Sequence, residues 1–125
     1  MLKLTMCVRR LPHLTHQEFD AYWLNHHGPL VRSHKDALRI RRYVQTLTID
    51  DPIAQERIRA GRDALKVEFD GYAELWWDSL DDHIAARKTP EGAAALRELL
   101  EDERRFVDLP CSQLWYGTER QVIPE

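Results

Sequence analysis

Residues 14–32, with the sequence LTHQEFDAYWLNHHGPLVR, constrain the fold more than any other stretch of this chain. Thr15 stands three residues before Glu18, the spacing of a capping box, in which each side chain satisfies a free backbone amide of the first helical turn. The pattern predicts a helix from Thr15 to about Lys35. Because a proline inside a helix removes a hydrogen bond and clashes with the preceding turn, we expect a kink or a broken turn at Gly28-Pro29.

One face of this helix is aromatic and apolar. Successive helical residues are rotated by about 100°, which brings to one side Phe19, Tyr22, Trp23, His26 and Leu30. A stripe of this kind usually packs into a core, and a histidine within it is more often a hydrogen-bonded packing residue than a catalyst. The same rotation places His26 near the centre of the face and His27 at its edge, from which a side chain can reach a cavity.

Four further stretches have strand patterns. Residues 2–9 alternate strictly between apolar and polar side chains, and residues 39–49 are rich in β-branched side chains. Residues 70–77, DGYAELWW, open on a turn-favouring pair and then predict a third strand. Residues 111–117, CSQLWYG, predict the last one.

Helix start signals divide the remaining chain. Ser79, three residues before an aspartate, predicts a short helix over about residues 80–88. Thr89, followed by a proline at the first helical position, predicts a second helix over about residues 90–106, with an apolar inner face that also includes Glu103. Residues 53–66 are polar and predict a surface loop with one short helix.

The order of these elements is βαββαβ, which with right-handed crossovers gives an α+β, ferredoxin-like antiparallel sheet with its helices on one face. We expect one domain over residues 1–118 and a C-terminal tail over residues 119–125. The third strand is apolar on both faces, yet so short a chain has no element left to cover the second face. A second copy would cover it, so we expect a homodimer.

The motif in the first helix is similar to the signature of the EthD family. The matching residues are Phe19, Trp23, His27, Gly28, Pro29, Leu30 and Val31. The resemblance implies a dimeric α+β barrel, in which two sheets pack together, and it gives the key position of the motif to His27. Relatives in the family are associated with bacterial degradation of ethers and related compounds, and fungal relatives with dehydration steps in polyketide pathways.

A candidate site follows from the topology. The second half of the first helix lies over the far ends of the third and fourth strands, which are rich in aromatic residues. We predict His27 as a catalytic acid or base and Glu74 as its partner, although Glu74 could instead pair with an arginine such as Arg41 or Arg9. The expected ligand-binding residues are Trp23, His26, Tyr43, Tyr72, Trp76 and Trp115.

Composition excludes several other classes of function. The chain has 43% hydrophobic and 31% charged residues and a net charge of −3, with no basic face that suggests nucleic-acid binding and no membrane span. The N-terminal residues lack the pattern of a signal peptide. The two cysteines, Cys7 and Cys111, do not indicate a disulfide framework, so we expect a cytoplasmic protein. We expect neither a metal nor a cofactor, because the histidines lack converging companions and no nucleotide, phosphate or haem motif appears.

The leading functional hypothesis is therefore cofactor-free acid–base catalysis, of the dehydratase, lyase or isomerase type, on a small hydrophobic or aromatic metabolite of a catabolic or polyketide-type pathway. The alternatives are a non-catalytic small-molecule carrier or accessory protein of an oxidative degradation pathway, and a cofactor-free monooxygenase.

Overall fold

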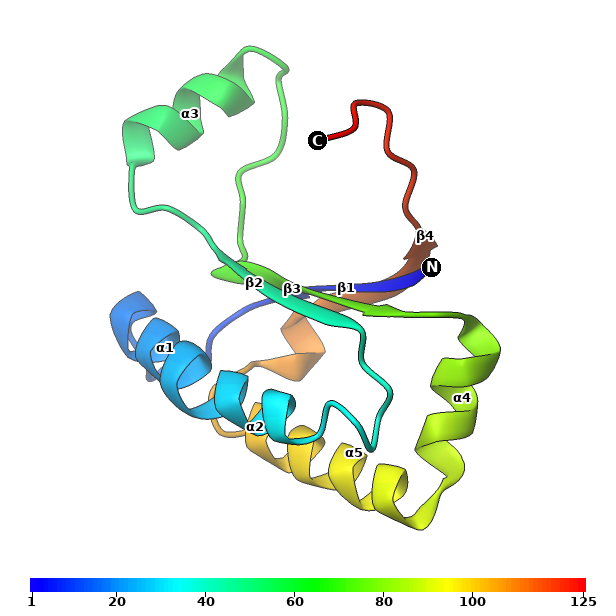
Figure 1. Cartoon of the computed structure of the whole chain (residues 1–125). Coiled ribbons are helices and arrows are strands. Elements are labelled where there is room, and N and C mark those ends of the chain that lie inside the picture. The colour runs from blue at the N-terminus through cyan, green and yellow to red at the C-terminus, as the bar shows by residue number, and fades with distance from the viewer.

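A computed structural model of the chain describes all of residues 1–125 and contains one four-stranded antiparallel sheet (Figure 1). Its strands are β1 (Leu2–Val8), β2 (Arg42–Leu47), β3 (Gly71–Trp77) and β4 (Gln113–Thr118), in the spatial order β2-β3-β1-β4. This is the order of a ferredoxin-like sheet, so the predicted α+β fold class is confirmed.

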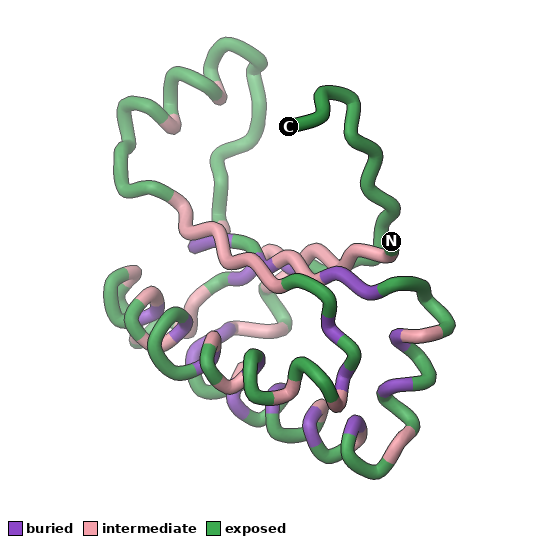
Figure 2. Tube along the Cα trace, in the orientation of Figure 1, coloured by how far each residue is buried: buried purple, intermediate pink, exposed green.

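The helices that pack on the sheet cover one of its faces. They are α1 (His16–Tyr22), a π-helical turn η1 (Trp23–His27), α2 (Gly28–Ser33), α4 (Leu80–Lys88) and α5 (Pro90–Glu103). The remaining helix, α3 (Pro52–Ala60), and the C-terminal tail rise on the other side of the sheet, where both are almost entirely exposed (Figures 1 and 2). None of the helices is both long and apolar enough to span a bilayer.

The helix starts are those that the side chains predict. Thr15 accepts a hydrogen bond from the Glu18 amide, and Glu18 accepts one from the Thr15 amide, which completes the capping box. Ser79 caps α4, and Thr89 caps α5 through the amide of Gly92. Several predicted boundaries were wrong: β2 spans residues 42–47 rather than 39–49, α5 ends at residue 103 rather than 106, and residue 111 lies in a short 3₁₀ turn before β4.

The first helix is irregular one turn earlier than expected. Gly28 donates its amide to the Trp23 carbonyl, five residues back, so the turn before Pro29 is wider than an α-helical turn. In a wider turn, each residue is rotated about the helix axis by less than the roughly 100° of an α-helix. Four residues after Trp23, His27 therefore lies on nearly the same side of the helix as Trp23. The turn therefore moves His27 from the edge of the apolar face into it and moves His26 out.

Strand parity decides which side chains meet the helices. Leu4, Met6 and Val8 of β1 and Ala73 and Trp77 of β3 face the helices and pack in the core, which continues through Phe19 of α1 and Phe106 after α5. The alternating residues of each strand face away from the helices, on the side from which α3 and the tail rise. Gly71 is required at the start of β3, because a Cβ there would lie 2.4 Å from the Thr46 carbonyl and 2.8 Å from the Trp23 ring.

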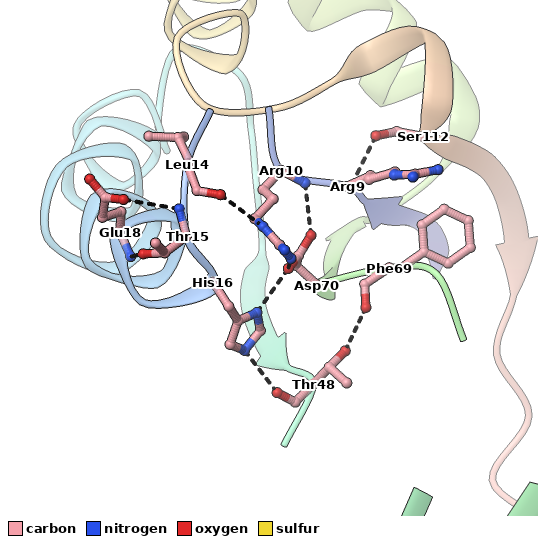
Figure 3. A network of polar contacts seen from close by, with 10 residues as sticks. All are labelled: Arg9, Arg10, Leu14, Thr15, His16, Glu18, Thr48, Phe69, Asp70 and Ser112. Atoms are coloured by element: carbon pink, nitrogen blue, oxygen red, sulfur yellow. Dashed lines mark hydrogen bonds and ion pairs between the residues drawn. The ribbon is translucent and has the colours of Figure 1, made fainter. Parts of the chain in front are cut away.

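A buried carboxylate ties the end of the sheet to the first helix (Figure 3). Asp70 accepts hydrogen bonds from the amide of Arg10 at 2.8 Å and from its guanidinium at 2.5 Å. The Nδ1 atom of His16 lies 2.8 Å from the same carboxylate, and its Nε2 lies 3.1 Å from the carbonyl of Thr48. The hydroxyl of Thr48 in turn donates to the Phe69 carbonyl. This network therefore holds together the two ends of the loop between β2 and β3, which contains α3.

Candidate functional site

A cavity of about 220 Å³ lies between the helices and the sheet. Its walls are mainly aliphatic and aromatic side chains from η1, α2, α4 and α5 and from all four strands, to which β2 contributes Tyr43. The polar or ionisable side chains on its walls are His27, Tyr43, His83, Arg87, Glu103 and Tyr116. An apolar space with a few polar groups is the usual composition of a small-molecule site.

His27 is held in this wall by a buried carboxylate. Its Nδ1 lies 2.8 Å from Oδ2 of Asp102, a residue of α5 with no exposed surface. Asp102 also accepts hydrogen bonds from the hydroxyl of Tyr22 at 2.5 Å and from Arg105 at 3.1 Å. Because Asp102 accepts the Nδ1 hydrogen, the neutral ring presents an unprotonated Nε2, which has no protein partner in the structure.

The electrostatics of this pair favour a neutral ring beside an ionised carboxylate. Burial lowers the pKa of His27, and the opposing attraction of Asp102 does not fully restore it. Burial by itself would raise the pKa of Asp102, but its hydrogen bonds from Tyr22, His27 and Arg105 outweigh burial and hold that pKa below the usual value. At neutral pH, His27 can therefore accept a proton, and Asp102 is placed to stabilise the cation that results.

Glu103 supplies a second titratable group on the same cavity wall. Burial, followed by repulsion from the neighbouring Asp102 carboxylate, raises the pKa of Glu103 to about 7. Its side chain makes no hydrogen bond or ion pair with the protein. Near neutral pH, a substantial fraction of Glu103 is thus a carboxylic acid that can donate a proton into an apolar space.

Tyr43 adds a hydroxyl group to the wall. It accepts a hydrogen bond of 2.9 Å from the Gln45 side chain, which also donates to the Trp23 carbonyl. Burial raises the pKa of Tyr43 to about 12, so the phenol stays protonated. Its own hydrogen has no protein acceptor and is free to bond to a ligand.

Three of the residues predicted for the site come together. His27, Trp23 and Tyr43 all line the cavity. His26 does not: its side chain is 57% exposed, stacks on Tyr22 and lies 3.4 Å from the outer oxygen of Asp102.

The other four predicted residues lie on the opposite face of the sheet, so the predicted grouping of Glu74, Tyr72, Trp76 and Trp115 with His27 was wrong. The reason is strand parity, because residues 72, 74 and 76 alternate with the core-facing residues of β3. Glu74 forms an ion pair with Lys3. The alternative prediction for Glu74 was also an ion pair, but with an arginine. Lys3 and Arg42 both lie over the Trp76 ring, and Trp115 is 50% exposed.

Sequence reasoning missed three residues that build the site. Glu103 gave a signal, since it is an acidic residue in the apolar stripe of α5, where an unpaired carboxylate is costly. Asp102 and His83 gave none, because their partners are distant in the chain. No group of three or more histidine, cysteine, aspartate or glutamate side chains is arranged to hold a metal ion.

Comparisons with known proteins agree with this fold. Residues 11–110 match the model of the EthD domain, and no curated protein matches the chain. An EthD family protein from Bacillus halodurans has a similar structure, with 22% identity and a TM-score of 0.62 over 96% of this chain and 100% of that one. An EthD-like protein from Ralstonia eutropha has 16% identity and a TM-score of 0.61, covering 99% and 94%.

A dimeric protein of ferredoxin-like fold from Bacteroides fragilis has 12% identity and a TM-score of 0.59, covering 94% of this chain and 95% of its own. At these identities, the structural likeness concerns the fold. The family match, in contrast, covers most of the chain and includes the helix that carries His27. The chain therefore belongs to the EthD family.

Proposed function

We propose that this protein is a cofactor-free acid–base catalyst that eliminates water from, or isomerises, a small apolar or aromatic molecule bound in the cavity. The observation that carries the proposal is the geometry of His27: Nδ1 bonds to a buried carboxylate, while Nε2 has no protein partner and the residue lines the cavity that Glu103 also lines. The first nitrogen fixes the ring and its tautomer, and the second is left for a substrate.

The groups present match the demands of an elimination. Nε2 of His27 takes a proton from a carbon next to a carbonyl group, and the electron pair of that C–H bond forms the new C=C bond. The hydroxyl group on the following carbon leaves with the proton of Glu103 and is released as water. The imidazolium and the Glu103 carboxylate return to their starting states when a proton passes from one to the other.

Tyr43 and Asp102 support this step. The free hydrogen of the Tyr43 hydroxyl can bond to the substrate carbonyl, where negative charge develops as the proton is removed. Asp102 acts as a positioning residue, because it holds the ring of His27 and stabilises its charged form without reaching the cavity itself.

The proposal includes a homodimer joined through the sheets. The sheet face away from the helices carries exposed aromatic side chains, Tyr72 and Trp115, and no layer of the same chain lies over them. Exposed apolar surface of this kind is typical of an interface between copies. Support comes from the Bacteroides fragilis structure, which is a dimer.

A panel of aromatic and aliphatic β-hydroxy carbonyl compounds, assayed by mass spectrometry for loss of water, tests the proposal. Once a substrate is found, His27→Gln should lower turnover by about 10²- to 10⁴-fold, because glutamine cannot accept the proton. His34→Gln is the matched control, since His34 forms a surface pair with Glu98 outside the cavity.

Measuring substrate affinity with the same variants separates a catalyst from the carrier alternative. A catalyst should keep its affinity in His27→Gln while losing turnover. Wild-type turnover in that variant, or a change in affinity with no turnover in any variant, would contradict the proposal.

A further inference from the structure

One buried polar side-chain atom of the chain has no hydrogen-bond partner, and it belongs to a residue that lines the same cavity. It is Nδ1 of His83, in α4. Buried polar groups are paired in the great majority of cases, because an unpaired one loses its bonds to water without replacement. A single exception therefore calls for a physical explanation.

The rest of the His83 ring is packed and hydrogen-bonded. Its centroid lies 4.0 Å from that of Trp77, and its Nε2 lies 2.8 Å from the hydroxyl of Tyr116 on β4. Burial, and then the charge of Arg87, lower the pKa of His83, so the ring is neutral. Phenylalanine would fill the same space on Trp77, and the half-exposed Tyr116 could then bond to water, so neither packing nor the Tyr116 bond explains the unpaired Nδ1.

Arg87 provides a second observation at the same place. It follows His83 by four residues on α4, so the two side chains share one face of the helix, and both line the cavity. Arg87 forms no ion pair in the structure. An imidazole with an unpaired nitrogen and an exposed arginine without an ion-pair partner thus lie on the same face of α4, beside a mostly apolar cavity.

We propose that His83 and Arg87 bind the carboxylate of an otherwise apolar substrate in the cavity. In this arrangement, the Tyr116 hydroxyl donates to Nε2 of His83, and Nδ1–H donates to one carboxylate oxygen. The Arg87 guanidinium donates to the carboxylate and balances its charge. The apolar body of the substrate then extends toward His27 and Glu103, on the wall formed by the first helix and α5.

This inference rests on the proposed function, since it assigns the substrate class for the same cavity. It narrows that class to apolar or aromatic carboxylic acids. The reaction that supplies the substrate must accordingly leave a free carboxylate on it.

A matched pair of probes tests the inference without a known substrate. The acid 2-naphthoate and its neutral amide, 2-naphthamide, have the same ring system and nearly the same shape, and isothermal titration calorimetry gives the affinity of each. Charge-assisted hydrogen bonds should make wild-type protein bind the acid about tenfold more tightly, or better. His83→Phe and Arg87→Gln should each remove most of this preference.

Lys88→Gln is the matched control, because Lys88 is the next cation of α4 but does not line the cavity. It should keep the preference for the acid. His83→Phe removes an unpaired polar atom together with one hydrogen bond to the half-exposed Tyr116, so it should unfold close to the wild-type temperature. Its loss of preference would then not come from misfolding. In wild type, titration with 2-naphthoate should shift the ¹⁵N resonance of His83 Nδ1.

The outcomes separate this inference from the proposed catalysis. Equal affinity for the acid and the amide, no saturable binding of either, or an unchanged preference in both variants would overturn it. A protein that prefers the acid, needs His83 and Arg87 for that preference, and yet turns over no compound would overturn the catalysis alone. His27→Gln should keep the preference, because His27 lies outside the carboxylate site.

Discussion

Two histidine–carboxylate pairs lie at the two ends of the first helical segment, and they differ in one respect. His16 contacts Asp70, and His27 contacts Asp102, each through Nδ1 at 2.8 Å and each to a buried aspartate. The Nε2 atom of His16 faces the Thr48 carbonyl, whereas Nε2 of His27 has no protein partner and its ring lines the cavity. The second nitrogen, rather than the pair itself, separates a structural histidine from a candidate catalyst.

The two carboxylates also have different surroundings. Asp70 bonds to both the backbone and the side chain of Arg10, and the whole cluster ties three chain segments together (Figure 3). Asp102 bonds to His27, Tyr22 and Arg105, all of which serve the helix layer beside the cavity. Removing the two charges should therefore damage different properties of the protein.

The largest expected effect is on turnover, and it should come from one aspartate only. Asp102→Asn should lower kcat by about 10²- to 10⁴-fold, because an amide neither stabilises the imidazolium nor fixes the correct tautomer. Asp70→Asn should keep kcat within about threefold, because its network does not reach the cavity. Equal losses in the two variants would mean that the free nitrogen of His27 is not what distinguishes the pairs.

The next effect is on stability, and the Asp70 variant allows it to be measured apart from turnover. Asp70→Asn should lower the free energy of unfolding by about 2 kcal/mol at pH 7, since charged hydrogen bonds to Arg10 and His16 are lost. Burial would raise the pKa of Asp70, but the bonds from Arg10 and His16 outweigh it and lower that pKa. The ionised group therefore stabilises the fold above the unfolded pKa of about 3.9, and this contribution is lost as the pH falls through the lower folded pKa.

Urea unfolding at several pH values measures this linkage. The difference between wild type and Asp70→Asn should be constant around neutrality and shrink on acidification below about pH 4. A difference that grows on acidification would contradict the assignment of Asp70 as an ionised, paired carboxylate.

The smallest effect concerns the pH profile. With the pKa of Glu103 at about 7, wild-type turnover should fall about tenfold per pH unit well above neutrality, as the proton donor is lost. Glu103→Gln should be slower than wild type around neutrality and should lack this alkaline decline. An unchanged decline in the variant would assign it to another group and remove Glu103 from the mechanism.

The sequence was most informative where local rules decide the structure. The capping box at Thr15 and the caps at Ser79 and Thr89 fixed three helix starts, and the order of elements was sufficient for the fold class. These signals are local, or they depend only on the order of the elements along the chain. They do not depend on which side chains meet across the sheet.

The site was less accessible, for two physical reasons. Residues 70–77 carry aromatic rings on both faces, so alternation alone could not say whether Trp76 or Trp77 meets the helices. His27 and Asp102 are 75 residues apart, and no local pattern indicates a contact of that kind. The family motif nevertheless favoured His27 over His26, against the angle of a regular helix, and the wide turn gives the physical reason why His27 lines the cavity.

That wide turn has a consequence for how such a chain can diverge. The turn contains one residue more than a regular α-helical turn. The number of residues in the turn therefore determines the direction of the His27 ring as much as their identities do. Loss of one residue between Trp23 and His27 would restore a regular helix and rotate the ring away from the cavity while leaving the aromatic anchors and the helix caps in place. Among relatives, a change in spacing at this point should therefore remove the proposed activity even where every named residue survives.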